Sequence, residues 1–583
     1  MLGQIDRLGR IWGMYTMAFG VFVVLLWLAE YVGLIGQRGI AWTFMILTIG
    51  IYATIGIMSR TGNLDEYYVA GRAVPGIFNG MATASDWMSA ASYISLAGTL
   101  YVLGMEGLSY TVGWTGGYVL LAMFLAPYIR KLGAYTIPDF VGVRYPGTFP
   151  RVVAVIAAII VSGTYLVAQV SGVGIIMSRF LGLDFRIACF VGLLGILVCS
   201  MLGGMKAVTW TQVAQYIILI VAFILPTVFV SAKITGVPIP QLMYGQALTD
   251  VAATEAALGI DKGYFTPFND WTQSQFLALI ICLMCGTAGL PHVIVRFYTT
   301  PNVRETRFSV GWALFFIGLM YITIPAYAAF ARWEVLHNVV GQAIDSLPSW
   351  VDAWTKTGLL TLNDANGNGL VEYAEFGLNS DLVVLAMPEI AGLPYVVAGL
   401  VAAGGLAAAL STADGLLMVV ATAISHDIYF KLINKSASDR VRLTISRVML
   451  VTVAAIAAWV ASLRLSIISD IVAWAFSLAA ASFFPILVLG IFWKRINTAG
   501  AITGMAFGLL TTLGYIIWSS VTGQTIGGIL PNAAGIFGMP LNFLLTIVIS
   551  LATAPPKQEI QALVERLRFP KHLHDAAAPA TGD

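Results

Sequence analysis

Apolar stretches long enough to cross a lipid bilayer recur along almost the whole chain. A membrane-spanning helix needs about 20 predominantly apolar residues. We predict fourteen such helices, at residues 12–33, 40–58, 75–100, 107–129, 152–178, 187–203, 207–232, 272–297, 308–331, 394–428, 443–463, 466–493, 499–521 and 534–553. Only 10% of the residues are charged, whereas soluble domains carry about 25%. The sequence therefore predicts an all-α polytopic membrane protein whose solvent is the bilayer.

The distribution of positive charge predicts the orientation of these helices. With the N-terminus in the cytoplasm, 23 of the 31 Lys and Arg residues fall on the cytoplasmic side, as the positive-inside rule requires. We therefore expect a multi-pass protein of the cell (inner) membrane with both termini in the cytoplasm. The net charge of +2 is too small to indicate that the protein binds nucleic acid.

The order of the helices suggests an internal repeat. Helices three to seven and eight to twelve form two blocks of five, and an odd number per block inverts the second block relative to the first. The first helix of each block is interrupted by small, hydroxylic or Gly/Pro residues, at 82–92 and at 285–292. Broken helices of this kind line a binding site near the membrane midplane in inverted-repeat transporters. Close packing through small residues is the alternative reading.

This pattern predicts both the domain organisation and the class of function. We expect accessory helices in 1–60, a first repeat with an external loop in 61–270, a second repeat in 271–493, two C-terminal helices in 494–554 and a cytoplasmic tail in 555–583. The sequence contains no zinc triad, nucleophile elbow or paired catalytic carboxylates, so we do not expect an enzyme. A channel and a transporter-like sensor are the rivals from other classes.

Five segments carry a resemblance to a known family: residues 68–72, 84–86, 203–211, 289–299 and 410–414. Together they resemble the sodium:solute symporter family, over roughly residues 40–520 and in the same order. The resemblance implies a LeuT-type fold of two inverted five-helix repeats. The segment Gly286–His292 is most similar to the cation/acetate and monocarboxylate branch. Some relatives have a small membrane subunit, which the sequence leaves open as a partner.

The resemblance also implies where a sodium ion binds. It assigns the ion to Ser85 and Met88 in the third helix and to Ala408, Ser411 and Thr412 in the tenth. Positions i, i+3 and i+4 share one helical face. Ala84 and Trp87 are the alternative register in the third helix, and hydroxyls that bond only to their own helix are the alternative role. Gln212 stands where some members place an Asp for another sodium, so we expect one sodium per cycle.

Residues near the two interruptions are the candidates for binding the substrate: Asp86, Ser89, Ser92, Gly286, Thr287, Gly289 and His292. No Lys or Arg is expected in the middle of a span, so half-helix N-termini, hydroxyls and the sodium must meet the charge of a carboxylate substrate. Asp86 and Asp414 lie deepest among the acidic residues, where charges are usually functional. We expect a sodium-coupled importer of a small organic solute such as acetate, with an amino acid, a sugar or proton coupling as alternatives.

Residues 364–375 resemble no part of a transporter core. They match the calcium loop of an EF-hand at its ligand positions, with Asp364, Asn366, Asn368, Leu370, Glu372 and Glu375 at positions 1, 3, 5, 7, 9 and 12. Gly369 stands at the sharp turn. The expected topology places this loop outside the cell, so the sequence predicts a structural Ca²⁺ site there. A chance match in a polar turn is the alternative.

Overall fold

The computed structural model describes residues 2–260 and 263–569. Twelve helices in this part of the chain are long and apolar enough to cross a membrane. The prediction of fourteen is higher because two predicted spans, 75–100 and 187–203, are not single uninterrupted helices. The predicted tail 555–583 is described only as far as residue 569. An all-α polytopic membrane protein is confirmed.

The first half of the chain supplies an outer pair of helices and a first block. The outer pair is α1 (Leu2–Tyr31) and α2 (Gln37–Met58). The block comprises α4 (Gly76–Trp87), a π-helical turn (Ala91–Ser95) that leads into α5 (Leu96–Leu103), α6 (Leu108–Leu120), α7 (Ala126–Leu132), α9 (Thr148–Leu181), α10 (Phe185–Val191) and α11 (Leu193–Thr235). Two short helices serve as connections: α3 (Leu64–Val69) leads from the outer pair into the block, and α8 (Ile137–Arg144) joins α7 to α9.

The second half supplies a second block and two further helices. The block comprises α13 (Gln273–Gly289), α14 (Pro291–Tyr298), α15 (Val303–Tyr321), α16 (Ile324–Asn338), α19 (Tyr395–Thr422), its π-helical continuation to Ile433, α20 (Asp439–Ala461) and α21 (Ile468–Phe492). Then come α22 (Thr498–Thr522), α23 (Gly535–Ala552) and α24 (Gln558–Arg568).

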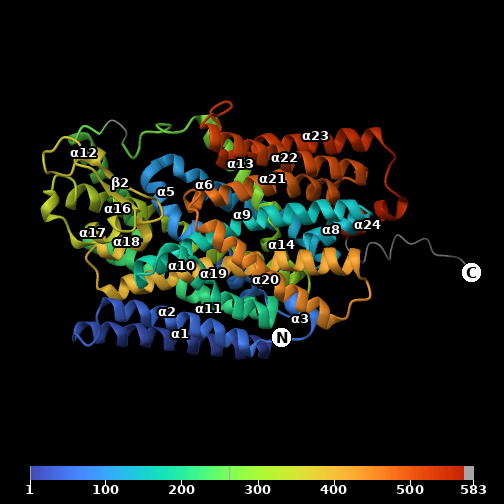
Figure 1. Ribbon diagram of the computed structural model, residues 1–583, viewed down its shortest axis with the longest axis horizontal. Helices are drawn as coiled ribbons and strands as arrows, with labels where there is room; N and C mark the ends of the chain where they lie inside the picture. The colour runs from blue at the N-terminus through green and yellow to red at the C-terminus, as the bar shows by residue number, and fades with distance from the viewer. Residues whose placement is uncertain (1, 261–262, 570–583) are drawn as a thin grey trace, which may run out of the picture.

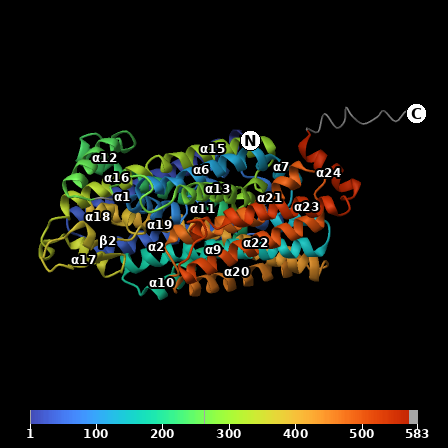
Figure 2. The same ribbon diagram turned by 90° about the horizontal axis from the view of Figure 1, so that it is seen from above.

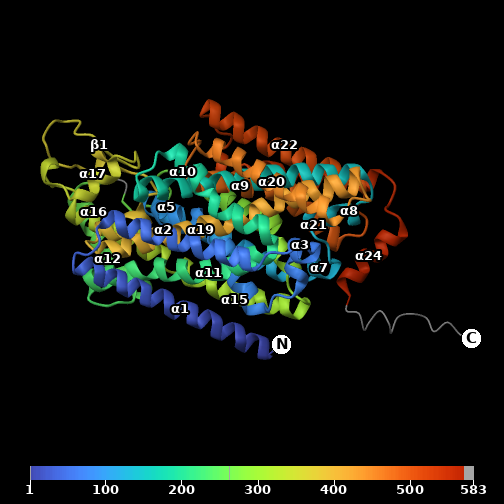
Figure 3. The same ribbon diagram turned by 60° about the horizontal axis from the view of Figure 1, so that its bottom comes forward.

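Connecting elements gather at the two ends of the bundle. One end holds α12 (Pro240–Ala257), α17 (Ser349–Thr355), the antiparallel strands β1 (Leu360–Leu362) and β2 (Phe376–Leu378), and α18 (Val383–Ile390). The other end holds α3, α8 and α24 (Figure 1, Figure 3). The long connections predicted at 234–271 and 332–393 therefore lie together at one end.

Helix α19 lies in the middle of the bundle (Figure 1, Figure 2). The most apolar 18-residue window of its span is 100% buried, whereas that of α1 at the periphery is only 11% buried. A helix that packs on every side must be apolar or small-sided all round, and α19 is rich in Gly and Ala. Polar side chains on α19 therefore face other helices and not lipid.

The 43-residue α11 is not one straight helix. Gly204 has φ 55° and ψ −144°, outside the helical region. A Cβ at this position would lie 2.5 Å from the carbonyl oxygen of Tyr67. Only glycine combines this backbone conformation with so close an approach, which is why the apolar run predicted as 187–203 and 207–232 is divided there by a kink.

Candidate functional site

The helix that begins as α4 is interrupted inside the protein. Its regular part ends at Trp87, and the chain becomes helical again at Ala91. Met88 has φ −75° and ψ 65° and lies outside the helical region. Irregular backbone at membrane depth is tolerated where protein groups satisfy it.

This interruption releases two carbonyl groups. In an unbroken helix the N–H groups of Ser89 and Ala90 would bond to the carbonyls of Ser85 and Asp86. Here the N–H of Ser89 bonds two residues back, and that of Ala90 donates to the side chain of Gln169 at 2.8 Å. The carbonyls of Ser85 and Asp86 are therefore available to side chains of a facing helix.

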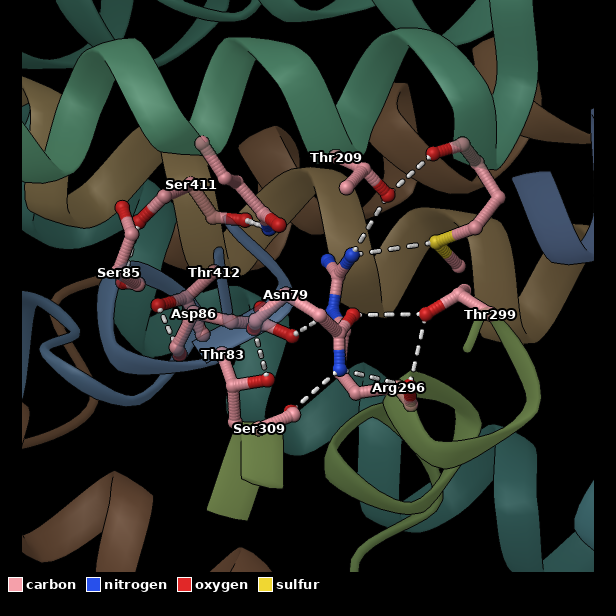
Figure 4. A network of polar contacts seen from close by, with 12 residues as sticks. Asn79, Thr83, Ser85, Asp86, Thr209, Arg296, Thr299, Ser309, Ser411 and Thr412 are labelled. Carbon is pink, nitrogen blue, oxygen red and sulfur yellow. Dashed lines mark hydrogen bonds and ion pairs between the residues drawn. The ribbon is translucent and has the colours of Figure 1, made fainter. Parts of the chain in front are cut away.

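The facing helix is α19, which meets these carbonyls with two hydroxyls (Figure 4). Ser411 donates to the carbonyl of Ser85 at 2.7 Å, and Thr412 donates to that of Asp86 at 2.8 Å. The carbonyl oxygen of Ala408 lies 2.9 Å from the hydroxyl oxygen of Ser411 and 3.3 Å from that of Thr412. Five oxygens from two helices thus meet at one buried point. Uncharged carbonyl and hydroxyl oxygens of this kind suit a hard monovalent cation.

The structure brings together four of the five residues predicted for the cation. For Met88, the described hydrogen bond runs from its N–H to Ala84 within α4 at 2.8 Å, and none links it to α19. The carbonyl of Asp86 is the second one in contact with the hydroxyls. Gln212 donates to the carbonyl of Ser411 at 2.7 Å and so holds this turn of α19 in place.

A buried ion pair lies beside this cluster. Nε of Arg296 on α14 is 3.0 Å from Oδ2 of Asp86, and the two side chains are 0% and 1% exposed. The guanidinium also donates to Thr209 of α11 at 3.2 Å (Figure 4). The expectation that no Lys or Arg lies in the middle of a span did not reveal this pair. Arg296 is close to the end of its apolar run, but α14 packs inside the bundle and Asp86 supplies the opposite charge.

A second interruption separates α13 from α14. Leu290 adopts an extended conformation, with φ −72° and ψ 121°, between Gly289 and Pro291. A Cβ at Gly286 would lie 2.2 Å from the carbonyl oxygen of Phe476, and one at Gly289 would lie 2.8 Å from that of Ala479. Both glycines therefore allow α13 to pack closely against the backbone of α21.

The other residues predicted for the substrate differ in their surroundings. Thr287 donates to the carbonyl of its own helix four residues earlier, at 2.7 Å. The hydroxyl of Ser92 lies 2.9 Å from that of Tyr321. Ser89 Oγ and His292 Nδ1 are buried and have no hydrogen-bond partner among the described residues. Among the described residues predicted for the substrate, these two and Asp86, whose Oδ1 has no partner either, offer an unused polar atom to a ligand.

Sequence reasoning missed Gln169, the polar side chain that caps the restarted helix. It lies on α9 and is 0% exposed. An amide within the apolar run 166–170 was a visible signal, because a polar side chain buried in a membrane helix requires a partner. The partner, the N–H of Ala90, could not be read from the sequence because the two residues are far apart along the chain.

A cluster of ionisable side chains joins α8, α9 and the π-helical end of α19. Oxygens of Asp139 and Asp427 and a ring nitrogen of His426 lie within 4.8 Å of one another. Arg151 Nη1 bonds to both carboxylates, at 2.9 and 2.8 Å. Arg151 and Thr136 already bond to these carboxylates, so the cluster ties three helices together at one end of the bundle.

The predicted calcium loop adopts a compact turn between β1 and β2. The carboxylate of Asp364 accepts from the backbone N–H groups of Asn368 and Gly369, both at 3.1 Å. Glu372 Oε1 accepts from the side-chain amides of Asn366 and Asn368, at 2.8 and 2.9 Å. The side chains at positions 1, 3, 5 and 9 therefore turn toward the same space.

The loop is also fixed from outside. Val371, at position 8, exchanges hydrogen bonds with a neighbouring segment: its N–H donates to Gln342 at 2.9 Å, and its carbonyl accepts from Gly341 at 2.8 Å. Arg332 lies over the ring of Tyr373 at 4.4 Å and pairs with Glu255 at 2.6 Å. The loop is thereby joined to α16 and α12.

Comparison with known proteins places the chain among membrane transporters. A model of the sodium:solute symporter family matches residues 67–346 and 374–508. An uncharacterized symporter of Cupriavidus necator is 42% identical, over 96% of this chain and 98% of the relative. A monocarboxylic acid transporter of Corynebacterium glutamicum is 27% identical, over 88% of this chain and 91% of the relative.

A solved structure shares the fold. The substrate-bound, outward-open state of a Na⁺-coupled sialic acid symporter superposes with a TM-score of 0.68, over 89% of this chain and 99% of that chain, at 17% sequence identity. The predicted fold class is thereby confirmed. The family match passes over residues 347–373, which include most of the predicted calcium loop.

Proposed function

Since this chain belongs to the sodium:solute symporter family, we propose that it imports a short monocarboxylate such as acetate together with sodium. It is a multi-pass, sodium-coupled solute symporter and not an enzyme. The family resemblance found in the sequence is confirmed. The identity of the solute, the residues that bind it and the direction of transport belong to the proposal.

One observation carries the proposed sodium site. The interruption of α4 releases the carbonyls of Ser85 and Asp86 at the point where α19 presents Ser411 and Thr412. Each hydroxyl can turn its hydrogen away and offer its lone pairs instead. With the carbonyl of Ala408, five oxygens would then coordinate the ion, while Arg296 neutralises the adjacent carboxylate of Asp86. Met88 remains a candidate for a further ligand.

The same contact suggests how sodium is coupled to transport. Because the ligands come from α4 and α19, a bound ion would hold these two helices together. A ligand shifts a conformational equilibrium only through its different affinity for the two states. We propose that sodium stabilises the state in which the interrupted helix is ordered, and that this state binds the solute before alternating access releases both on the other side.

The choice of a monocarboxylate has two supports. The sequence of Gly286–His292 is most similar to the monocarboxylate branch of the family. One relative at 27% identity is named a monocarboxylic acid transporter. Apart from Arg296, which Asp86 neutralises, no basic side chain is described in contact with the two interruptions. A small singly charged solute is consistent with such surroundings, and an amino acid or a sugar is the alternative solute.

The placement in the cell is part of the proposal. We place both termini in the cytoplasm of a cell with the protein in its inner membrane, because Lys and Arg are concentrated on that side. We assign 61–270 and 271–493 to the two inverted repeats. The end of the bundle that holds α12, α17 and α18 would then face outward.

Uptake into proteoliposomes tests the proposed function. Radiolabelled acetate, propionate, lactate and pyruvate would be offered with and without an inward sodium gradient. We expect accumulation only with the gradient. Uptake that follows a pH gradient and ignores sodium would show proton coupling instead, and uptake of an amino acid or sugar with none of a monocarboxylate would overturn the proposed solute.

A second proposal concerns the external loop 364–375, which we assign to Ca²⁺. Its support is the match at the ligand positions and the way these side chains turn toward one space. The segment that follows reaches the transport core: the backbone of Ser380 packs against Gly98 of α5, and Asp381 accepts from the N–H of Ile468 at the start of α21, at 3.2 Å. Calcium would therefore stiffen the external end of the bundle.

Replacing Glu375 by Gln tests this proposal. Glu375 would supply both oxygens at position 12, and the change removes its charge, so we expect the affinity for calcium to fall by about 10-fold or more. Terbium luminescence excited through the nearby Tyr373 gives the readout, with displacement by calcium. The matched control is Asp352→Asn, an exposed carboxylate of α17 outside the loop. Equal affinity in the native protein and in Glu375→Gln would refute the calcium site.

A further inference from the structure

Gln169 has a fixed orientation in which its donor group is unused. Its Oε1 accepts the N–H of Ala90 at 2.8 Å, where the interrupted helix restarts. An amide turned the other way would face that N–H with another donor, so the orientation follows from the hydrogen bond. The Nε2 group of this fully buried side chain has no partner among the described residues. A buried donor left without an acceptor destabilises the protein, and an acceptor on a ligand would remove that cost.

Other unused polar atoms lie around the same interruption. Two further buried atoms have no hydrogen-bond partner among the described residues: Ser89 Oγ, directly before Ala90, and His292 Nδ1, at the start of α14. The ring of Tyr165, one turn before Gln169 on α9, lies 5.2 Å from the ring of His292. The two interrupted helices and α9 therefore place several unused polar atoms around this interruption.

Aromatic rings pack against one another beside this interruption. The ring of Phe476 on α21 lies 5.6 Å from Tyr165, 6.4 Å from Trp87 and 5.7 Å from Trp114. Trp87 lies 5.4 Å from Tyr118 of α6. Small-molecule sites combine apolar and aromatic walls with a few placed polar groups, and these rings would enclose a short apolar chain.

We propose that Gln169 determines the specificity of the transporter for a carboxylate, because its Nε2 donates directly to the carboxylate of the bound substrate. This inference rests on the proposed function and names the group that recognises its substrate class. The restarted helix contributes the positive end of its dipole beside Gln169, and Ser89 contributes a hydroxyl. The aromatic rings receive the short carbon chain.

Arg296 is not the group that recognises the anion. Its charge is already balanced, because Nε pairs with Asp86 at 3.0 Å and Nη1 bonds to Thr209 at 3.2 Å; only Nη2 has no partner among the described residues. Neutral donors suit a substrate that must be released on the other side, because a buried ion pair with Arg would hold it more tightly.

The variant Gln169→Glu separates the two functions of this side chain. Glutamate retains an oxygen that can accept the N–H of Ala90, so the interruption keeps its support. It has no N–H to offer, and its own charge repels an anion. We expect the KM for sodium-driven acetate uptake to rise about 10-fold or more, with kcat much less affected.

A neutral analogue makes the test specific. Acetamide has the shape of acetate but carries N–H donors in place of one oxygen. It should compete poorly with acetate in the native protein and should bind to Gln169→Glu, whose carboxylate accepts those donors. The matched control is Thr164→Val on the same helix, where the hydroxyl bonds only to its own helix at 2.8 Å. If Gln169→Glu does not fold, Gln169→Asn, whose shorter amide cannot reach as far, should raise the KM in the same way.

The outcomes separate this inference from the proposed function. Sodium-driven acetate uptake in the native protein, with an unchanged KM and no gain of acetamide competition in Gln169→Glu, would overturn the role of Gln169 alone. No uptake of any monocarboxylate by the native protein would overturn the proposed solute, and this inference with it.

Discussion

Replacing both Ser411 and Thr412 by Ala should abolish sodium-driven uptake while the protein still folds. The double variant removes two of the five oxygens that meet between α4 and α19. A hydrogen bond or contact to a charged group is worth about 1.5–3 kcal/mol, so the apparent affinity for sodium should fall by about 100-fold or more. The measurement is the initial rate of acetate uptake as a function of sodium concentration in proteoliposomes.

A hydroxyl of purely local function provides the control. Thr48 of α2 is buried, and its hydroxyl bonds to the carbonyl of Phe44 in its own helix at 2.8 Å. Thr48→Val should leave the sodium dependence unchanged. If the Ser411/Thr412 variant kept the native sodium dependence, the two hydroxyls would serve only to join the helices and the proposed cation site would be wrong.

Replacing Arg296 by Ala should destabilise the protein strongly. The change leaves the carboxylate of Asp86 buried beside α19 without its counter-charge. Removing one partner of a buried ion pair typically costs about 3–5 kcal/mol. We expect a large fall in the thermal midpoint of the protein purified in detergent, or loss of folded protein altogether.

Two further variants show whether the unpaired charge is the cause. Adding Asp86→Asn to Arg296→Ala removes the stranded charge and should recover part of the stability. Lys356→Ala breaks an ion pair whose side chains are 72% and 73% exposed, and such surface pairs are worth about 0–1 kcal/mol. An Arg296→Ala protein as stable as Lys356→Ala would contradict this account of the pair.

The sequence predicted the elements whose signal is local. The apolar runs identify the helices, and the small and hydroxylic residues at 82–92 and 285–292 identify the two interruptions. The spacing of Ala408, Ser411 and Thr412 identifies one face of α19. These features depend on neighbours within a few residues, which periodicity can reveal.

The features that the sequence did not reveal depend on contacts between distant segments. The carbonyl of Asp86 faces Thr412 because the N–H of Ala90 bonds to Gln169 instead. The spacing of residues along the chain does not show that Ala90 bonds to Gln169 and not to Asp86. Arg296 lies at the end of an apolar run, where a basic residue usually reaches the cytoplasm, and only the packing of α14 shows that it is buried with Asp86.

Two of the predicted spans are not single uninterrupted helices for a related reason. The run 75–100 is apolar throughout, but its two helical parts are separated after Trp87. Hydropathy measures the cost of burial in lipid and does not detect a break that other helices cover. Interruptions of this kind concentrate where backbone groups serve a function.

Binding of radiolabelled acetate to the purified protein, with sodium or with choline as the only cation, tests the central claim most directly. The claim is that sodium bound between α4 and α19 orders the interruption beside which the solute binds. The account predicts saturable acetate binding in sodium, much weaker binding in choline, and loss of the difference between the two cations in the Ser411→Ala/Thr412→Ala protein. Equal acetate affinity in sodium and in choline, in native protein that is folded, would contradict it.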